Sequence, residues 1–243
     1  MEARMDTTDP FTATIPAPTA ARPLLGLTVL VVEDSRFACE ALRLLCLRSG
    51  ARIRRADCLR SARRHLRVYR PSVIIIDLGL PDGSGLDLIE ELAHSQPAIV
   101  GILAMSGDPV LENAALAKGA HEFMSKPIVA LAPFQDKVLS LLPPEQRPQG
   151  PRRVDLTKVE PDRIAYRDDI AHVADILEDA PTDHTLDYVA QFLVGVAQAA
   201  GDDGLAAAAK TLARQRAKGH AAASDKARIA GLIQTRLAER IAI

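Results

Sequence analysis

The sequence predicts an α/β fold, a doubly wound five-stranded parallel sheet, joined to a second, all-α domain. From residue 28 to residue 142, apolar runs of strand length alternate with longer stretches in which apolar residues recur at helical spacing. A Pro-rich segment follows at 143–151, and beyond it apolar residues recur at helical spacing only. At 243 residues, the chain also exceeds the commonest length of a single domain.

The first domain is expected to contain five strands and five helices in alternation. The expected strands are 28–32, 51–56, 73–77, 99–105 and 121–124. The expected helices are 35–48, 59–69, 86–92, 109–118 and 132–142. The run from Val73 to Ile76 is apolar on both faces, as in a central strand of a parallel sheet. Since strands and helices alternate, right-handed crossovers should make all the strands parallel.

The composition along the chain predicts four segments. Residues 1–24, with four prolines among Thr and Ala, are expected to be a disordered or extended tail. Residues 25–143 are expected to form the α/β domain, and 144–152 a Pro-rich linker. Residues 153–243 are expected to form a helical output or interaction domain, in which about four amphipathic helices pack as a bundle.

The bulk composition argues against membrane insertion, export and nucleic-acid binding. No apolar run reaches the roughly 18 residues that span a bilayer, and the chain does not start with a basic and then apolar export signal. We therefore expect a cytoplasmic location and no membrane partner. From residue 152 onward, 13 Lys or Arg face 14 Asp or Glu. Because proteins that bind the phosphate backbone usually carry a basic excess, nucleic acid is not an expected partner.

Polar residues follow the ends of four expected strands. Glu33 and Asp34 follow the first strand, Asp77 ends the third, Ser106 follows the fourth, and Lys126 follows the fifth. The carboxyl ends of parallel strands meet at one edge of a sheet, so these side chains should share a pocket. Three carboxylates repel one another unless a cation joins them, and oxygen ligands suit Mg²⁺. The pattern predicts an aspartyl-phosphate site in which Asp77 is the nucleophile.

Four motifs carry a resemblance to a known family. In order and spacing, VLVVEDS, IIIDLGLPDGSGL, AMSG and FMSKP resemble the flavodoxin-like receiver domains of two-component response regulators, over about residues 27–142. The resemblance implies that Glu33 and Asp34 organise Mg²⁺, that Asp77 is both metal ligand and phosphoacceptor, and that the carbonyl of Gly79 completes the metal shell. It implies a phosphoprotein that assists its own Mg²⁺-dependent phosphorylation and dephosphorylation rather than a metabolic enzyme.

The same resemblance implies a switch and a donor. Ser106 would be the switch hydroxyl, Lys126 the phosphate contact, and Phe123 the aromatic side chain whose rotamer follows Ser106. Pro127 resembles the family's cis-proline. The donor would be a histidine kinase or a histidine phosphotransfer protein, which makes the chain part of a phosphorelay.

Taken one at a time, the site residues of the first domain also have other interpretations. Glu33 and Asp34 could merely begin a helix, Ser106 could be an ordinary helix cap, and Lys126 an ordinary surface lysine. Hydrolases with an aspartyl-phosphate intermediate are the alternative enzyme class, but they typically need a second acid two residues after the nucleophile. Gly79 stands at that position.

The sequence indicates the function of the helical domain less clearly than that of the first domain. A protein-interaction or dimerisation bundle, with a downstream protein partner or self-association, is the preferred hypothesis, and a DNA-binding transcriptional regulator is the alternative. The segment 202–213 resembles the helix of histidine-containing phosphotransfer domains, with Lys210 at the place of the phosphorylated histidine. His172, His184 and His220 are interpreted as surface or core histidines.

Overall fold

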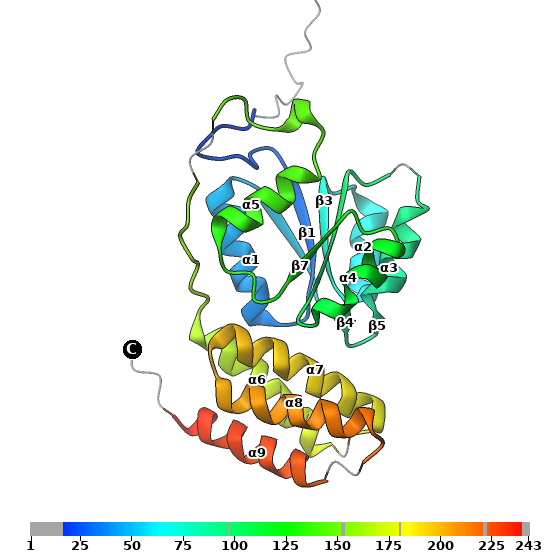
Figure 1. Cartoon of the computed structure of the whole chain (residues 1–243), viewed down its shortest axis with the longest axis vertical. Coiled ribbons are helices and arrows are strands. Elements are labelled where there is room, and N and C mark those ends of the chain that lie inside the picture. The colour runs from blue at the N-terminus through cyan, green and yellow to red at the C-terminus, as the bar shows by residue number, and fades with distance from the viewer. Residues whose placement is uncertain (1–16, 97, 152–153, 180, 221–222, 240–243) are drawn as a thin grey trace, which may run out of the picture.

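The computed structural model describes residues 17–96, 98–151, 154–179, 181–220 and 223–239. Most of the expected tail, residues 1–16, lies outside the described residues. The described residues form an α/β domain and a helical domain at one end of its sheet, joined by a connecting segment that runs along the side of the α/β domain (Figure 1). No helix in the described part of the chain is long and apolar enough to cross a membrane.

The sheet has five strands, and every neighbouring pair is parallel. The strands are β1 (Thr28–Val32), β2 (Arg52–Ala56), β3 (Val73–Asp77), β6 (Gly101–Ser106) and β7 (Glu122–Ser125). Their order across the sheet is β2-β1-β3-β6-β7, so the chain winds first toward one edge and then toward the other. The predicted doubly wound five-stranded sheet is confirmed.

Helices cover both faces of the sheet (Figure 1). One face carries α1 (Arg36–Ser49) and α5 (Leu131–Ser140), and the other carries α2 (Leu59–Val68), α3 (Gly85–Ala93) and α4 (Glu112–Ala117). The expected helix at 109–118 begins as a 3₁₀ turn at Pro109–Leu111. A short hairpin, β4 (Gly79–Leu80) and β5 (Gly83–Ser84), lies between β3 and α3.

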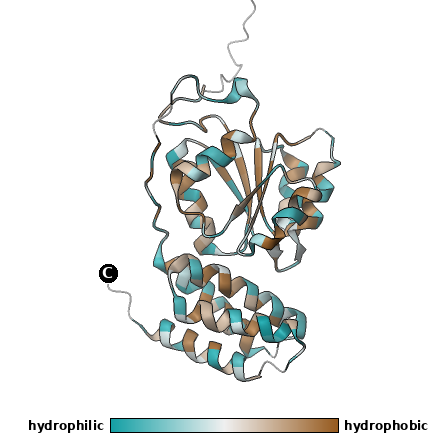
Figure 2. Cartoon of the chain, in the orientation of Figure 1, coloured by the Kyte–Doolittle hydropathy of each residue, from teal (hydrophilic) through white to brown (hydrophobic). Residues whose placement is uncertain are grey.

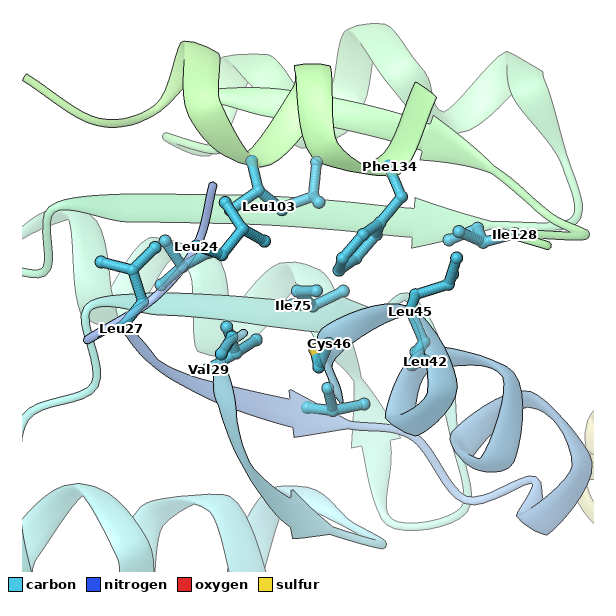
Figure 3. Packing of buried hydrophobic residues seen from close by; sticks show 14 of the residues in the cluster. Leu24, Leu27, Val29, Leu42, Leu45, Cys46, Ile75, Leu103, Ile128 and Phe134 are labelled. Carbon is cyan, nitrogen blue, oxygen red and sulfur yellow. The ribbon is translucent and has the colours of Figure 1, made fainter. Parts of the chain in front are cut away.

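The strands divide their side chains between two hydrophobic cores. Val31 and Ile75 point toward α1 and α5, where Figure 3 shows Phe134 of α5 projecting toward Ile75 from the opposite layer. The alternate residues Leu30 and Ile74 belong to the core under α2, α3 and α4. Because both faces are covered, the inner strands β1, β3 and β6 are mostly apolar and buried along their length, whereas the edge strand β2 carries three arginines. Figure 2 shows strands of the sheet in brown. The run Val73–Ile76, which predicted a central strand, is apolar on both faces because helices cover both sides of β3.

The packed α/β unit extends beyond the expected limits of 25–143. Leu24 is fully buried in the core beside α1, and its amide donates to the Ser49 carbonyl. At the other end, Val159 is buried in the same core, and its amide donates to the Val129 carbonyl. The part of the chain just after the Pro-rich linker thus runs along α5 before the helical domain begins.

The helical domain contains four helices in its described residues. They are α6 (Arg163–Glu178), α7 (Asp183–Ala200), α8 (Asp203–Ala217) and α9 (Ala223–Ala238). They bury a core of their own, in which Ile170, Leu193, Leu212 and Ile233 are fully buried. The predicted all-α second domain is confirmed.

Candidate functional site

An acidic cluster lies at the carboxyl edge of the sheet. Glu33 and Asp34 directly follow β1, and Asp77 is the last residue of β3. The two strands are parallel neighbours with Val32 opposite Ile76, so the residues that follow them emerge side by side. One ligand oxygen from each of the three carboxylates lies within 4.8 Å of the others. Glu33 is only 2% exposed and Asp77 only 6% exposed, so the cluster is largely withdrawn from water.

Lys126 supplies a positive charge to this cluster. Its Nζ lies 2.7 Å from Glu33 Oε2 and 3.1 Å from Asp77 Oδ2. The lysine directly follows β7, and its amide donates to the Ser106 carbonyl at 2.8 Å, which continues the pairing of β6 with β7. The Lys126–Pro127 peptide bond is cis, as expected.

Burial and repulsion raise the pKa of all three carboxyls. Burial raises the pKa of Glu33 to about 7 despite the attraction of Lys126, and it raises that of Asp77 to the same value. The pKa of Asp34 rises to about 6 through burial and the neighbouring charge of Asp77. Burial opposes the charge of Lys126, but Asp77 and Glu33 outweigh it, so the pKa of the ammonium lies above its usual value. The cluster thus carries more negative charge than one lysine neutralises.

The free oxygen of Asp34 fits a cation. Asp34 Oδ1 is buried and accepts no hydrogen bond from the described residues. A buried carboxylate oxygen without a donor is costly, and a hard divalent cation would satisfy it. Asp77 and the backbone of Gly79 line the same cavity as Asp34. The donor set therefore consists of oxygen atoms, as Mg²⁺ prefers.

The other expected site residues lie around Asp77. Ser106 ends β6 and is buried, and its Oγ accepts a hydrogen bond from the Asp108 amide at 3.1 Å. On the neighbouring strand, Met105 lies opposite Asp77. Ser106 directly follows Met105, so its hydroxyl lies at the same edge of the sheet as Asp77. Phe123 is buried on β7 in the core under α2, α3 and α4. All seven expected residues are thus at or beside this edge.

Sequence reasoning missed the role of Gly85, which fixes the loop after Asp77. A Cβ at this position would lie 2.1 Å from the Asp77 carbonyl oxygen and 2.9 Å from Leu78 Cα. The Gly85 amide also donates to the Leu78 carbonyl. Only glycine permits this close approach of two backbone segments. The repeated glycines of the loop motif could have indicated it.

Residues of the helical domain also reach the site, and no local sequence pattern indicates them. The Tyr188 hydroxyl of α7 donates a hydrogen bond to Asp34 Oδ2. Asp169 of α6 accepts hydrogen bonds from the first residues of α1. The side-chain amide of Gln191 lies against Gly79.

A cavity of about 890 Å³ lies between the two domains. Asp77 and Lys126 line it from the α/β domain, and Lys210 lines it from α8. The lysine at the place of a phosphotransfer histidine therefore faces the same cavity as Asp77. His172, His184 and His220 are not among its lining residues.

Comparisons with known proteins agree over the α/β domain. The family model described as the response regulator receiver domain matches residues 29–134. The KDP operon transcriptional regulatory protein KdpE of Escherichia coli is 34% identical over 99 residues, which make up 41% of this chain and 44% of that protein. The transcriptional regulatory protein CitB of Klebsiella pneumoniae is 35% identical over 107 residues, with 42% of this chain and 45% of that protein covered.

The chain also aligns with solved structures. A putative response regulator from Chloroflexus aurantiacus aligns with 47% of this chain and 96% of its own at 24% identity and a TM-score of 0.45. This chain spans less than half the length of the two curated relatives. These comparisons do not support the expectation against nucleic acid, because both relatives are named as transcriptional regulators. The family match stops before the helical domain, and residues 29–134 of this chain are a response regulator receiver domain.

Proposed function

We propose that the protein is a phosphorelay response regulator that accepts a phosphoryl group on Asp77 and signals through its helical domain. The observation that carries this proposal is the acidic cluster with Lys126 Nζ 3.1 Å from Asp77 Oδ2, at the carboxyl edge of the sheet. The donor is a phosphohistidine of a histidine kinase or of a histidine phosphotransfer protein. The protein acts in the cytoplasm.

The residues of the site divide the chemistry among them. An Asp77 carboxylate oxygen attacks the phosphorus in line, a P–O bond forms, and the P–N bond to the donor histidine breaks. Lys126 and the Ser106 hydroxyl hold phosphoryl oxygens that carry negative charge. Asp34, Asp77 and the Gly79 carbonyl would hold Mg²⁺, with Glu33 organising them. When bound, Mg²⁺ neutralises the charge that builds up between the carboxylates and the phosphoryl group.

Ser106 and Phe123 form the proposed switch. The Ser106 hydroxyl accepts from the Asp108 amide and keeps its own proton, which it donates to a phosphoryl oxygen when the side chain moves toward Asp77. That movement alters the loop between β6 and α4, next to which Phe123 is packed. Phosphorylation then changes output by shifting the population of two arrangements of this face.

The helical domain is proposed to bind a downstream protein or a second copy of the chain. The nearly equal numbers of acidic and basic residues from residue 152 onward support this over DNA binding. The names of the curated relatives favour the second candidate, a transcriptional regulator. Fluorescence anisotropy with labelled duplex DNA, alongside light scattering, separates the two: salt-sensitive DNA binding would support the regulator, and a DNA-independent dimer the interaction domain.

Labelling with a small phosphodonor tests the acceptor. With acetyl phosphate and Mg²⁺, the intact chain should gain one phosphoryl group, and Asp77→Asn should gain none. Asp87→Asn is the matched control, because this aspartate is exposed on the neighbouring α3. Full labelling of Asp77→Asn would refute the assignment. Rapid turnover of many phosphoesters without stable labelling would favour a hydrolase.

A further inference from the structure

The acceptor site is covered by the chain's own helical domain. We infer that α6 and α7 form an autoinhibitory cover, which must leave the acceptor face before a protein donor can reach Asp77 and which loading of the site displaces. Figure 1 shows these helices at the end of the sheet where the acceptor lies. The inference rests on the proposed function of Asp77.

Asp169 of α6 is the first contact that holds the cover. Its carboxylate, in a side chain that is 3% exposed, accepts from Ser35 Oγ at 2.7 Å, the Arg36 amide at 2.8 Å and the Phe37 amide at 3.0 Å. The first amides of a helix have no partner within it, and a negative charge there is favourable. A residue of the second domain thus completes the start of α1, directly after Glu33 and Asp34.

Two further contacts surround this one. Arg36 Nη1 forms an ion pair with Asp168 Oδ2 at 2.6 Å on the exposed side. On the inner side, the rings of Phe37 and Tyr166 meet edge to face, with their centres 5.9 Å apart. Polar, ionic and aromatic contacts therefore join the same two elements, the first turn of α1 and the first half of α6.

Tyr188 and Gln191 of α7 bring the cover to the acceptor site itself. The Tyr188 hydroxyl donates to Asp34 Oδ2, so the helical domain uses a carboxylate of the acidic cluster. One turn further along α7, the amide of Gln191 lies against Gly79, where a Cβ would meet its Nε2 at 2.6 Å. These contacts place α7 beside the residue that must receive the phosphoryl group.

The cover admits small ligands to the acceptor site but excludes a folded protein donor. The acidic cluster borders two cavities of about 890 and 860 Å³, and residues of α7 line both, Gln191 the first and Tyr188 the second. A metal ion or a small phosphodonor fits such spaces. A folded donor must bring its phosphohistidine within about 3 to 3.5 Å of the acceptor oxygen, and α7 stands in that approach.

Binding of a cation and a phosphoryl group at the acceptor site opposes docking of the helical domain, because both use the same residues of the receiver domain. A cation bound to Asp34 withdraws charge from the oxygen that accepts from Tyr188, and a phosphoryl group on Asp77 adds oxygens beside the loop that Gln191 touches. If docking weakens loading, loading weakens docking by the same factor. Phosphorylation therefore frees the surfaces of α6 and α7 for a partner.

Hydrogen exchange of the full chain tests the cover. Peptides that span residues 35–40 and 184–195 are followed with and without Mg²⁺ and beryllofluoride, a mimic of the phosphoryl group. We expect exchange in both peptides to become several-fold faster on loading. Unchanged or slower exchange in the loaded chain would overturn the inference, because α7 would then be a fixed part of the site.

Variants separate the cover from general destabilisation. Tyr188→Phe removes one hydroxyl, and Asp169→Ala removes the contact to α1; both should speed exchange at 35–40 several-fold before loading. Glu178→Ala is the matched control, because this residue is exposed on the far end of α6. Exchange as slow in both variants as in the control would overturn the inference. Failure of beryllofluoride to bind, with no labelling of Asp77, would instead contradict the proposed function.

Discussion

Lys126 Nζ lies 3.1 Å from Asp77 Oδ2, and the same ammonium lies 2.7 Å from Glu33 Oε2. It therefore offsets the repulsion between two buried carboxylates. Removing one partner of a buried ionic group costs more than the group contributes when intact, because the remaining charges lose their compensation. The lysine should be important for stability before any phosphate is bound.

Replacing this lysine should destabilise the receiver domain in a pH-dependent way. We expect Lys126→Met to lower the free energy of unfolding by about 3 kcal/mol at pH 8. The loss should be smaller at pH 5, where Glu33 and Asp77, each with a pKa of about 7, are protonated. Thermal denaturation in a chelator at both pH values measures this. Lys118→Met, which breaks an exposed pair with Glu90, should change stability by less than about 1 kcal/mol. Equal losses at the two pH values would contradict the prediction.

Stabilisation by Mg²⁺ should grow with pH. The folded pKa values of Asp77 and Asp34, about 7 and 6, lie above the ordinary value of 3.8. The folded cluster therefore binds more protons than the unfolded chain, and the stability that it contributes below about pH 4 is lost as the pH rises toward 7. Mg²⁺ replaces those protons. The rise in melting temperature on adding Mg²⁺ should be larger at pH 8 than at pH 5.

A variant distinguishes this cluster from nonspecific metal binding. Asp34→Asn removes one ligand charge, so the pH-dependent part of the Mg²⁺ effect should shrink. Asp87→Asn, on the exposed side of α3, should leave the effect unchanged. A metal effect that is the same at pH 5 and pH 8 would argue against a site made of these carboxylates.

The loop after Asp77 should tolerate no side chain at Gly85. A Cβ would lie 2.1 Å from the Asp77 carbonyl oxygen, so Gly85→Ala must displace the backbone of Asp77. We expect a loss of roughly 2 kcal/mol or more in stability and slower labelling by acetyl phosphate. Gly231→Ala is the control, because this residue lies on α9 and a Cβ there meets nothing within 4 Å. Denaturation and labelling of both variants provide the measurement, and a fully stable, fully labelled Gly85→Ala chain would refute the close packing.

The sequence predicted the sheet and its site because both depend on local patterns. The run Val73–Asp77 is apolar up to its last residue, so it identifies a buried strand and the acid at its end. In the structure, β1 and β3 are parallel neighbours, which brings Glu33 and Asp34 beside Asp77. Parallel order alone implies this meeting at one edge.

The docking of the second domain could not be predicted in the same way. Asp169 looks like an ordinary polar residue of an amphipathic helix, yet it contacts residues more than 130 positions earlier. Tyr188 lies on the amphipathic helix α7, and its hydroxyl reaches Asp34 of the other domain. Such contacts depend on how two domains meet, and neither periodicity nor motif spacing within one domain contains that information.

Asp202 should hold three parts of the helical domain together. Its carboxylate accepts from the Leu205 amide at the start of α8, from the Tyr166 hydroxyl of α6 and from two nitrogens of Arg236 on α9. We expect Asp202→Asn to lower the stability of this domain by about 2 kcal/mol at pH 7, through the lost ion pair and the weakened helix cap. Urea unfolding followed by circular dichroism measures the change.

The pH dependence of this stability loss shows how much of it comes from the negative charge of Asp202 rather than from the packing of its side chain. The Arg236 pair and the hydrogen bonds lower the pKa of Asp202 to about 2, against an ordinary 3.8. The stability from its charge is therefore fully present above about pH 4 and is lost as the pH falls toward 2. The difference between the intact chain and Asp202→Asn should shrink over that range. Asp203→Asn, at the exposed first position of α8, should cost only a few tenths of a kcal/mol. A control as damaging as Asp202→Asn would show that the helix start, rather than the contacts to α6 and α9, determines the stability.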